Sequence, residues 1–365
     1  MHRILLAITV SIIFTLGLAM IFNTTSAEVI DHSLNQSTHK AILKQALYAL
    51  VGALFGFIVW TQGYQKVIRY SPVILLILTF LLILCLVPGV GRKINGARRW
   101  VSLLGVSLQP SEFVKLILPA YLIYQLRLRQ WEVPSFVAFL KLTIPALIPL
   151  ALVVVEPNNG TAGVIGLACS VVLVIANVPA KYWALPLLVM GCLSVTVALS
   201  MPYVRSRLEV YWNPELDIKG KGHQPHQAKI AAGSGRFLGK GVGNSLQKLS
   251  YLPEAQNDYI AAIYAEEFGF VGMITLLSLY MTVTLIGFSV AYRCQTPEGA
   301  CYASVITFLI AFQAFMNLGV VSGLLPSTGL NLPFFSQGGT SLMANMMGVG
   351  ILLSISKDCK GWVLE

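Results

Sequence analysis

Charged side chains are scarce in this chain of 365 residues, where they make up 11% of the total. Soluble domains carry about 25% charged residues. Acidic side chains are the scarcer kind, with 15 carboxylates against 25 Lys and Arg, so the formal net charge is +10. Together with 56% hydrophobic residues and a mean hydropathy of +0.74, this excludes a soluble globular domain. The sequence predicts an integral membrane protein that contacts the lipid bilayer, and we expect no nucleic-acid partner.

The sequence lacks segments of about ten residues with alternating polar and apolar side chains, the pattern of a transmembrane β-barrel. It has instead about ten apolar runs that reach the roughly 17–25 residues a membrane-spanning helix needs. We therefore expect an all-α, polytopic membrane protein with about ten transmembrane helices in a single domain over residues 1–365. The predicted spans are 4–22, 43–62, 71–88, 110–126, 138–155, 160–178, 183–201, 265–291, 301–322 and 339–356.

Lys and Arg in the short loops predict that both termini are cytoplasmic. The six cysteines then fall within spans or in cytoplasmic segments, so none is available for an external disulfide. The first span could instead be a signal peptide, because Thr25-Ser26-Ala27 resembles a cleavage site. Its apolar run is longer than the usual 7–15 residues, and cleavage would leave every later span facing the same way.

Two predicted outer segments depart from the charge pattern. The first, "GVGRKINGARRWVSLLGVSLQPSE" at 89–112, places four cations, Arg92, Lys93, Arg98 and Arg99, where positive charge is disfavoured. Phospholipid headgroups or local carboxylates could neutralise them. Alternatively they bind a substrate phosphate, since an Arg fork matches phosphate oxygens.

The second outer segment runs from about 202 to 264, between the seventh and eighth spans, and is the only predicted extramembrane stretch large enough to build a site. Its glycines at 233–243 allow sharp turns or close approach to a ligand. Lys240, between two glycines, fits an anion-binding nest or an ordinary turn. Four of the carboxylates gather near its end, at Glu254, Asp258, Glu266 and Glu267.

Ionisable side chains within the predicted spans are candidates for function, because they are costly in hydrocarbon. Glu112 and Lys115 lie three residues apart on one helical face and could neutralise each other. Glu156 ends the fifth span, where Pro157 and Gly160 break the helix before the sixth.

Four motifs carry a resemblance to a known family. They are "NGARRWVSLLGVSLQPSEFVKL" from 95, "NNGTA" from 158, "GVGNSLQKLSYLPEAQNDYIAAIYAEEFGFVG" from 241 and "GLLPSTGLNLPFFSQGGTSL" from 323. In order and spacing they resemble the signatures of the SEDS family (shape, elongation, division and sporulation), whose members polymerise peptidoglycan glycan strands. "YWNP" at 211 and "GNSLQKLSYLPEA" at 243 resemble the division branch more than the elongation branch, whereas "PSTGL" at 326 points the other way.

The resemblance implies a substrate, lipid II, and a base that takes the proton from the acceptor sugar hydroxyl as it attacks the donor's anomeric carbon. Asp258 aligns with the family's catalytic Asp; the alternative, which spacing alone favours, is that it caps the helix that follows. Glu254, Glu266 and Glu267 are weaker candidates for the base and are expected to hold cations, cap helices or orient loops. The residues implied in substrate binding are Arg98, Arg99, Gln109, Ser111, Glu112, Lys115, Lys240, Lys248, Glu254, Ser336, Gly338 and Gly339.

The resemblance also implies partners and a location. The partners would be a class B penicillin-binding protein, which is a transpeptidase, and other divisome proteins; the location would be the division site in the bacterial inner membrane. A divalent cation, Mg²⁺ or Mn²⁺, is left open as a cofactor at the diphosphate.

Departures from the family pattern lie at "EPNNGTA" (156–162), where Glu156 and Asn158 replace the usual Gln and Asp, and at "SQGGT" (336–340). Two other functions stay open besides the division polymerase and the elongation polymerase. A lipid II flippase would use the ionisable residues in the spans, although the sequence lacks the matching halves typical of transporters. A catalytically silent scaffold of the divisome is the other.

Overall fold

The computed structural model describes residues 2–32, 39–94, 97–103, 106–200, 205, 209, 211, 223–248 and 256–359. Within this part of the chain, ten helices lie at the ten predicted spans, and seven of them are long and apolar enough to cross a membrane. The prediction of a polytopic helical membrane protein is confirmed. The ten are α1 (His2–His32), α2 (His39–Gln62), α3 (Tyr64–Leu86), α4 (Pro110–Leu128), α5 (Phe136–Val155), α6 (Asn159–Ile175), α7 (Ala180–Ser200), α10 (Ile260–Arg293), α11 (Pro297–Val321) and α12 (Gly339–Ile355).

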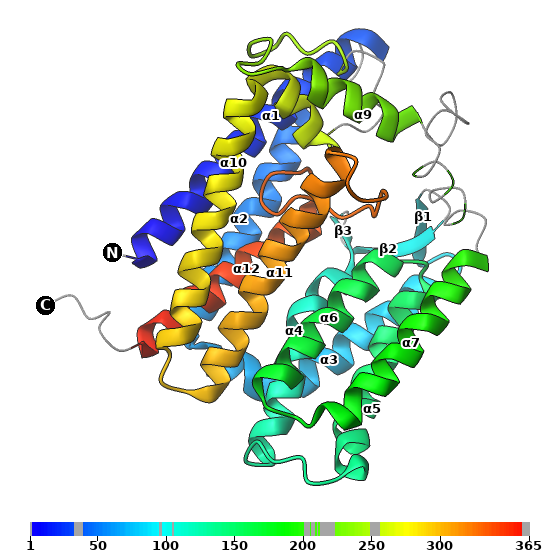
Figure 1. The fold of residues 1–365 in the computed structure, drawn as a ribbon, viewed down its shortest axis with the longest axis vertical. Helices are drawn as coiled ribbons and strands as arrows, with labels where there is room; N and C mark the ends of the chain where they lie inside the picture. Colours follow the sequence, from blue (N-terminus) through cyan, green and yellow to red (C-terminus); the bar gives the residue numbers. More distant parts are fainter. Residues whose placement is uncertain are drawn as a thin grey trace, which may run out of the picture.

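The helices form a bundle with distinct inner and outer members (Figure 1). Large apolar side chains stay exposed on the outer helices, among them Leu50 on α2 and Leu76 on α3. These faces suit contact with lipid tails, because a membrane helix does not need to hide apolar side chains. Most of α11 and α12 is buried, so these two helices form the centre of the bundle.

Small residues bring α2 and α12 close together. A Cβ added at Gly56 would lie 2.8 Å from the carbonyl oxygen of Met346, and a Cβ at Gly350 would collide with the backbone of Gly56. Such contact between backbones is typical of membrane helices. Lipid removes the hydrophobic driving force between them, and small residues allow the close van der Waals packing that holds them together. Gly350, in the small-residue run of the tenth predicted span, thus allows close packing of α12 against α2.

A small antiparallel sheet, which the sequence pattern did not predict, precedes α4. Its strands, β1 (Gly91–Ile94), β2 (Ala97–Leu103) and β3 (Val106–Leu108), pair in the order β1-β2-β3. The signal was present in the sequence, since Asn95-Gly96 between β1 and β2 is a pair favoured in two-residue hairpin turns. The same region of the chain carries the cluster of four cations.

The two ends of the bundle differ in what they carry. The sheet, the helix α9 (His223–Ser234), the turn 256–259 and the segment 322–338 lie toward one end, which we call the loop end (Figure 1). The start of α1 and the end of α12 lie toward the opposite end, which we call the terminal end. The predicted outer segments that the structure describes therefore share one end of the molecule.

Candidate functional site

Asp258 lies in the turn 256–259 directly before α10, at the loop end, and is half-buried. The turn is fixed on both sides of this residue. The main-chain carbonyl of Asp258 accepts a hydrogen bond of 2.9 Å from Nδ2 of Asn317, and the carbonyl of Gln256 accepts one of 2.9 Å from the main-chain N–H of Gln337. The following residues, Tyr259 and Ile260, are buried. The position of the Asp258 side chain therefore follows from the packing of α10, α11 and the segment 322–338.

The carboxylate of Asp258 faces Gly329 in the segment 322–338. Gly329 has a φ of 71°, and a Cβ built there would lie 3.8 Å from Oδ2 of Asp258. Asn317 ties the same region together, because its side-chain amide also donates to the carbonyl of Leu330 at 2.9 Å. One Asn side chain on α11 thus holds the Asp258 turn and the segment opposite it at a fixed separation.

The family motif at 336–339 lies in the wall beside this turn. The hydroxyl oxygen of Ser336 accepts from the main-chain N–H of Leu332 at 3.0 Å, and the side chain is 3% exposed. A Cβ at Gly338 would collide with the amide of Asn331, and one at Gly339 would collide with the ring of Tyr48. The glycines therefore permit close approach of two segments.

The start of α4 joins this wall through the residues of the "QPSE" motif. The main-chain N–H of Gln109 donates to Oγ1 of Thr340 at 3.2 Å, and Ser111 accepts from Nδ2 of Asn158 at 3.2 Å. Thr340 in turn donates to the carbonyl of Ser107 in β3 at 3.2 Å. These contacts attach the sheet to the first residues of α12, which follow directly after the segment that faces Asp258.

Glu112 and Lys115 form the predicted ion pair, with 2.7 Å between Nζ and Oε2. Both residues are buried, and Lys115 also donates to Oε1 of Gln313 at 2.7 Å. The three side chains line a cavity between α4, α11 and α12. Gln313 and Asn317 are four residues apart on α11, so they lie on one face, about 6 Å apart along the helix axis. The buried pair is therefore one helical turn below the support of Asp258.

The cations of the sheet differ in their surroundings. The guanidinium of Arg99 donates to the main-chain carbonyls of Glu156, at 3.1 Å, and of Pro157, so it links β2 to the end of α5. Arg98 is half-buried, whereas Arg92 and Lys93 are exposed. In the register of β1 and β2, Lys93 lies opposite Arg98. Since like charges repel at this separation, a bound anion would stabilise the pair.

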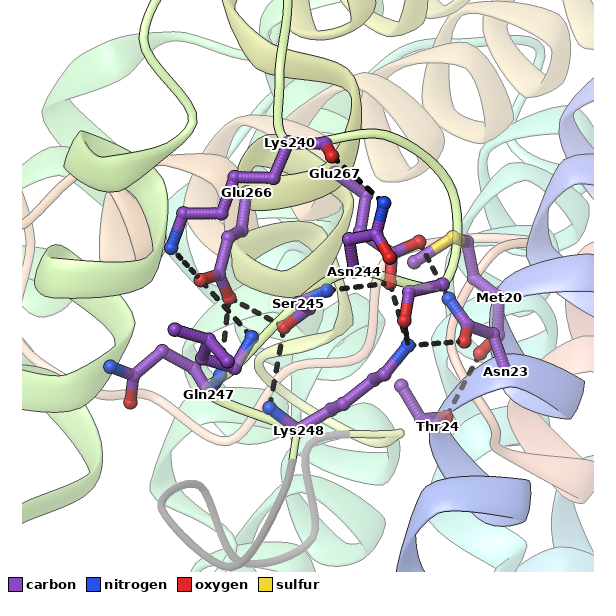
Figure 2. A network of polar contacts seen from close by, with 12 residues as sticks. Met20, Asn23, Thr24, Lys240, Asn244, Ser245, Gln247, Lys248, Glu266 and Glu267 are labelled. Carbon is purple, nitrogen blue, oxygen red and sulfur yellow. Dashed lines mark hydrogen bonds and ion pairs between the residues drawn. The ribbon is translucent and has the colours of Figure 1, made fainter.

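Lys240 and Lys248 are held by Glu266 and Glu267 in the network of Figure 2. Nζ of Lys240 lies 2.5 Å from Oε1 of Glu266, and Nζ of Lys248 lies 2.9 Å from Oε1 of Glu267. Asn23 on α1 completes the network, since it donates to Glu267 at 2.6 Å and accepts from Lys248 at 2.7 Å. The expectation that Glu266 and Glu267 hold cations is confirmed.

The same loop fills a break in α10. Gly269 interrupts the helix with φ 64° and ψ −160°, which leaves nearby main-chain groups without helical partners. The N–H groups of Phe270 and Val271 bind the carbonyls of Arg236 and Phe237, at 2.9 and 3.2 Å. In return, the carbonyls of Glu266 and Glu267 each accept from the loop, from the N–H groups of residues 240 and 241, at 3.0 Å. The loop 235–248 and the first turns of α10 are thus one hydrogen-bonded unit.

The predicted site residues fall into three groups. The first group surrounds the segment 322–338 and the start of α12 and contains Asp258, Ser336, Gly338 and Gly339. The residues of α4 and its start contact this group through α11 and α12; they are Gln109, Ser111, Glu112 and Lys115. Arg98 and Arg99 lie on the sheet, and Lys240 and Lys248 on the loop packed against α10. Glu254 lies outside the described residues. Sequence reasoning missed Asn317 and Gln313, although their spacing of four in an apolar helix was a signal for one polar face.

Comparison with known proteins gives one family over almost the whole chain. The model of a family of cell cycle proteins named for FtsW, RodA and SpoVE matches residues 3–361. The stage V sporulation protein E of Bacillus subtilis is 36% identical over 97% of this chain and 96% of its own length. A probable peptidoglycan glycosyltransferase FtsW of Trichlorobacter lovleyi is 33% identical over 98% of this chain and 94% of its own.

A solved structure has the same fold. It is described as "Structural coordination of polymerization and crosslinking by a peptidoglycan synthase complex", and one of its chains superposes with a TM-score of 0.75 at 26% identity, covering 98% of both chains. The match includes the loop end as well as the helices, because almost no residue of either chain lies outside it.

Proposed function

This chain belongs to the family of cell cycle proteins named for FtsW, RodA and SpoVE, and from that premise we propose that it is a peptidoglycan glycosyltransferase. Its substrate would be lipid II, a disaccharide-pentapeptide joined through a diphosphate to a polyprenyl tail. The reaction would extend glycan strands and release polyprenyl diphosphate. The site would comprise the segment about 202–264 together with the walls formed by 322–338 and the start of α4.

The observation that carries the proposal is the placement of Asp258. A carboxylate that acts as a base must meet its substrate while its own position stays fixed. Asp258 is half-buried, and its main chain is anchored to Asn317 on α11. Its carboxylate faces Gly329, which has no side chain.

In the proposed reaction, the acceptor sugar hydroxyl attacks the anomeric carbon of the donor sugar, and Asp258 takes the hydroxyl proton. The bond between the anomeric carbon and the diphosphate oxygen breaks, so negative charge grows on the leaving diphosphate. Cations placed at that oxygen lower the barrier. We assign this role to Arg98 with the exposed cations of β1, and the role of fixing the surrounding wall to Arg99, Gln109, Ser111 and Glu112. Lys115 would neutralise Glu112 within the spans.

Lys240 and Lys248 take a supporting role in this proposal. Their ammonium groups already neutralise Glu266 and Glu267, so they bind the loop 235–248 to α10 before any substrate arrives. A metal ion is not given a step. Among the described residues no group of three or more His, Cys, Asp or Glu side chains could hold one. In this proposal a divalent cation would reach the site with the diphosphate, as Mg²⁺ commonly does.

The chain is a bacterial membrane protein, as its apolar helices and its relatives indicate. We further propose that it lies in the cytoplasmic membrane at the division site, with the loop end outside and the terminal end in the cytoplasm. Its partners would be a class B penicillin-binding protein and other divisome proteins. A synthase complex that joins polymerisation to crosslinking has a chain of this fold, which supports the choice of partner. The relative from sporulation and the elongation members of the family leave the cellular process open to test.

The test is a polymerisation assay on purified protein with labelled lipid II, with and without a coexpressed class B penicillin-binding protein. We expect polymer from the unchanged chain and none from Asp258→Ala. Glu132→Ala is the matched control, because Glu132 is an exposed carboxylate outside the site, and it should polymerise normally. A measurement of lipid II translocation in vesicles runs beside it.

The buried Glu112–Lys115 pair supports the alternative function, a lipid II flippase, because ionisable groups in membrane spans often mark transport paths. Translocation that survives Asp258→Ala, with no polymer from any preparation, would contradict the glycosyltransferase and favour the carrier. Absence of both activities would favour the scaffold.

A further inference from the structure

Two cysteines meet at the terminal end, far along the bundle from Asp258. Cys294 follows α10 directly, and Cys359 follows the short 3₁₀ helix η2 (Ser356–Asp358) after α12. Both residues have extended backbones, with φ and ψ of −66° and 134° for Cys294 and −92° and 134° for Cys359. They pair as an isolated antiparallel β-bridge. Neither residue lies in the proposed site.

A hydrogen bond next to this bridge shows whether the two cysteines form a hydrogen-bonded or a non-hydrogen-bonded antiparallel pair. The main-chain N–H of Gln295 donates to the carbonyl of Asp358 at 3.3 Å, so the bond lies between the residues that flank the two cysteines. Cys294 and Cys359 are therefore a non-hydrogen-bonded antiparallel pair, in which Cα atoms are about 4.5 Å apart and side chains are closest. Disulfides require Cα separations of about 4.4–6.8 Å. The backbone pairing thus places the two Cα atoms within the range in which a disulfide can form.

The surroundings of the two thiols shift their pKa values in opposite directions. The neighbouring thiol of Cys359 lowers the pKa of Cys294, and Thr296 also lowers it through a contact of 3.5 Å between its Oγ1 and Sγ of Cys294. The neighbouring Cys294 and burial raise the pKa of Cys359, whose Sγ donates to the carbonyls of Val290 and Ile355 at 3.4 and 3.6 Å. The charged and titratable neighbours are Asp358, which opposes the thiolate of Cys294, Tyr64, and Arg3, which lowers the pKa of Cys359. Cys294 is thus the nucleophile of the pair and Cys359 the resolving thiol.

We propose that Cys294 and Cys359 form a reversible dithiol–disulfide site, a redox modification site separate from the glycosyl transfer. With a peroxide as oxidant, the thiolate of Cys294 attacks one peroxide oxygen. The S–O bond forms, the O–O bond breaks, and the other oxygen leaves as water after taking a proton. Cys359 then attacks the sulfenic acid, so that the S–S bond forms and a second water leaves. A dithiol reductant reverses the modification by thiol–disulfide exchange.

The positions of Cys294 and Cys359 determine which helices such a disulfide would connect. Cys294 ends the helix whose first turns follow Asp258, and Cys359 ends the segment after the central helix α12. Arg3 at the start of α1 donates to the carbonyl of Ser356 at 2.6 Å, so three helices already meet at this point. A disulfide would covalently tie α10 to the end of α12. At the predicted cytoplasmic face, reductants keep such a bond open except under oxidative conditions.

The test uses the full chain, purified in detergent and fully reduced. Thiols are counted under denaturing conditions after treatment with hydrogen peroxide, and the linked peptides are identified by mass spectrometry. The chain has six cysteines, so the expected count falls from six to four, with one internal link between residues 294 and 359. Cys294 should also react with a maleimide several times faster than Cys359 at neutral pH.

Three variants separate the possible outcomes. Cys294→Ser and Cys359→Ser should each abolish the link, whereas Cys192→Ser, which removes an exposed cysteine, should still lose two thiols per chain. A count that stays at six in the unchanged chain, or a link between other cysteines or between two chains, would overturn the proposal. Because the readout is a covalent bond and not glycan synthesis, this result is independent of the proposed function.

Discussion

Two carboxylates of the loop end have contrasting surroundings. Asp258 is half-buried beside a glycine, whereas Glu156 is 0% exposed at the end of α5, against the thiol of Cys85 and near the guanidinium of Arg99. Burial raises the pKa of Glu156 to about 8, and the opposing effects of Cys85 and Arg99 are smaller. Glu156 is also a departure from the family motif, in which Gln is usual at this position. A neutral side chain is therefore what this position accommodates best.

Replacing Glu156 by Gln should change how stability depends on pH. The folded chain binds a proton at Glu156 up to about pH 8, whereas the unfolded carboxyl loses it near its ordinary value of 4.5. Folded protein thus holds more protons between these values, and stability falls as pH rises through this window. We expect Glu156→Gln to remove that loss and to raise Tm at pH 8 by at least about 2 °C, with little change at pH 5.

Thermal unfolding in detergent at the two pH values measures the effect. The unchanged protein at both pH values serves as the reference. A Gln125→Glu variant would not serve, because the side chain of Gln125 is hydrogen-bonded to other side chains. A Tm difference between variant and reference that is the same at pH 5 and pH 8 would show that the carboxyl of Glu156 does not titrate in this window.

Residue chemistry also explains which site residues the sequence could predict. The pair of Glu112 and Lys115 was predictable, because a spacing of three puts the charges on one helical face, and unpaired charges are costly in hydrocarbon. Asn317 was missed because an amide in a long apolar helix carries no charge to mark it. Its importance comes from what folds against it, the turn at Asp258 and the carbonyl of Leu330, and both contacts are set by tertiary structure.

At the scale of elements, the break in α10 determines how the loop 235–248 is placed. The glycines at 233–243 were expected to turn sharply or to approach a ligand. In the structure, Gly235 and Gly239 approach the backbone of α10 instead. The sequence could show that close approach was needed but not what was approached, since the partner lies across a helix break that periodicity does not reveal. The small sheet and α9 were missed because their short segments lie in a region read as loop.

Gly239→Ala should weaken the packing of the loop 235–248 against the first turns of α10. Gly239 has a φ of 82°, and an added Cβ would collide with the carbonyl of Glu267. Strain of this kind costs on the order of 1–3 kcal/mol. We expect a lower Tm and slower glycan synthesis, because the first turns of α10 also carry the turn of Asp258. Both are measured on purified protein, by thermal unfolding and by the polymerisation assay.

Gly163→Ala is the matched control. Gly163 lies in α6, where an added Cβ meets nothing within 4 Å. Alanine in a helix interior is about 0.5–1 kcal/mol more favourable than glycine, so this variant should keep or raise Tm. If Gly239→Ala were as stable and active as Gly163→Ala, the loop would not be held by α10 in the way described.

At the scale of the whole molecule, the helical bundle was the most predictable feature. Ten apolar runs became ten helices because the backbone must satisfy its own hydrogen bonds in lipid, and helix length then follows from membrane thickness. The gathering of distant segments at the loop end was less predictable. Asp258, the start of α4 and the segment 322–338 come together only through the packing of α11 and α12 between them.

The account rests on Asp258 as the base of a glycosyl transfer, and the most direct measurement separates binding from turnover. Asp258→Asn keeps the shape of the side chain and removes its basicity. We expect it to bind lipid II with a Kd close to that of the unchanged protein while polymerisation slows by at least about 100-fold, the usual contribution of a general base. Polymerisation by Asp258→Asn within about tenfold of the unchanged rate would contradict the account.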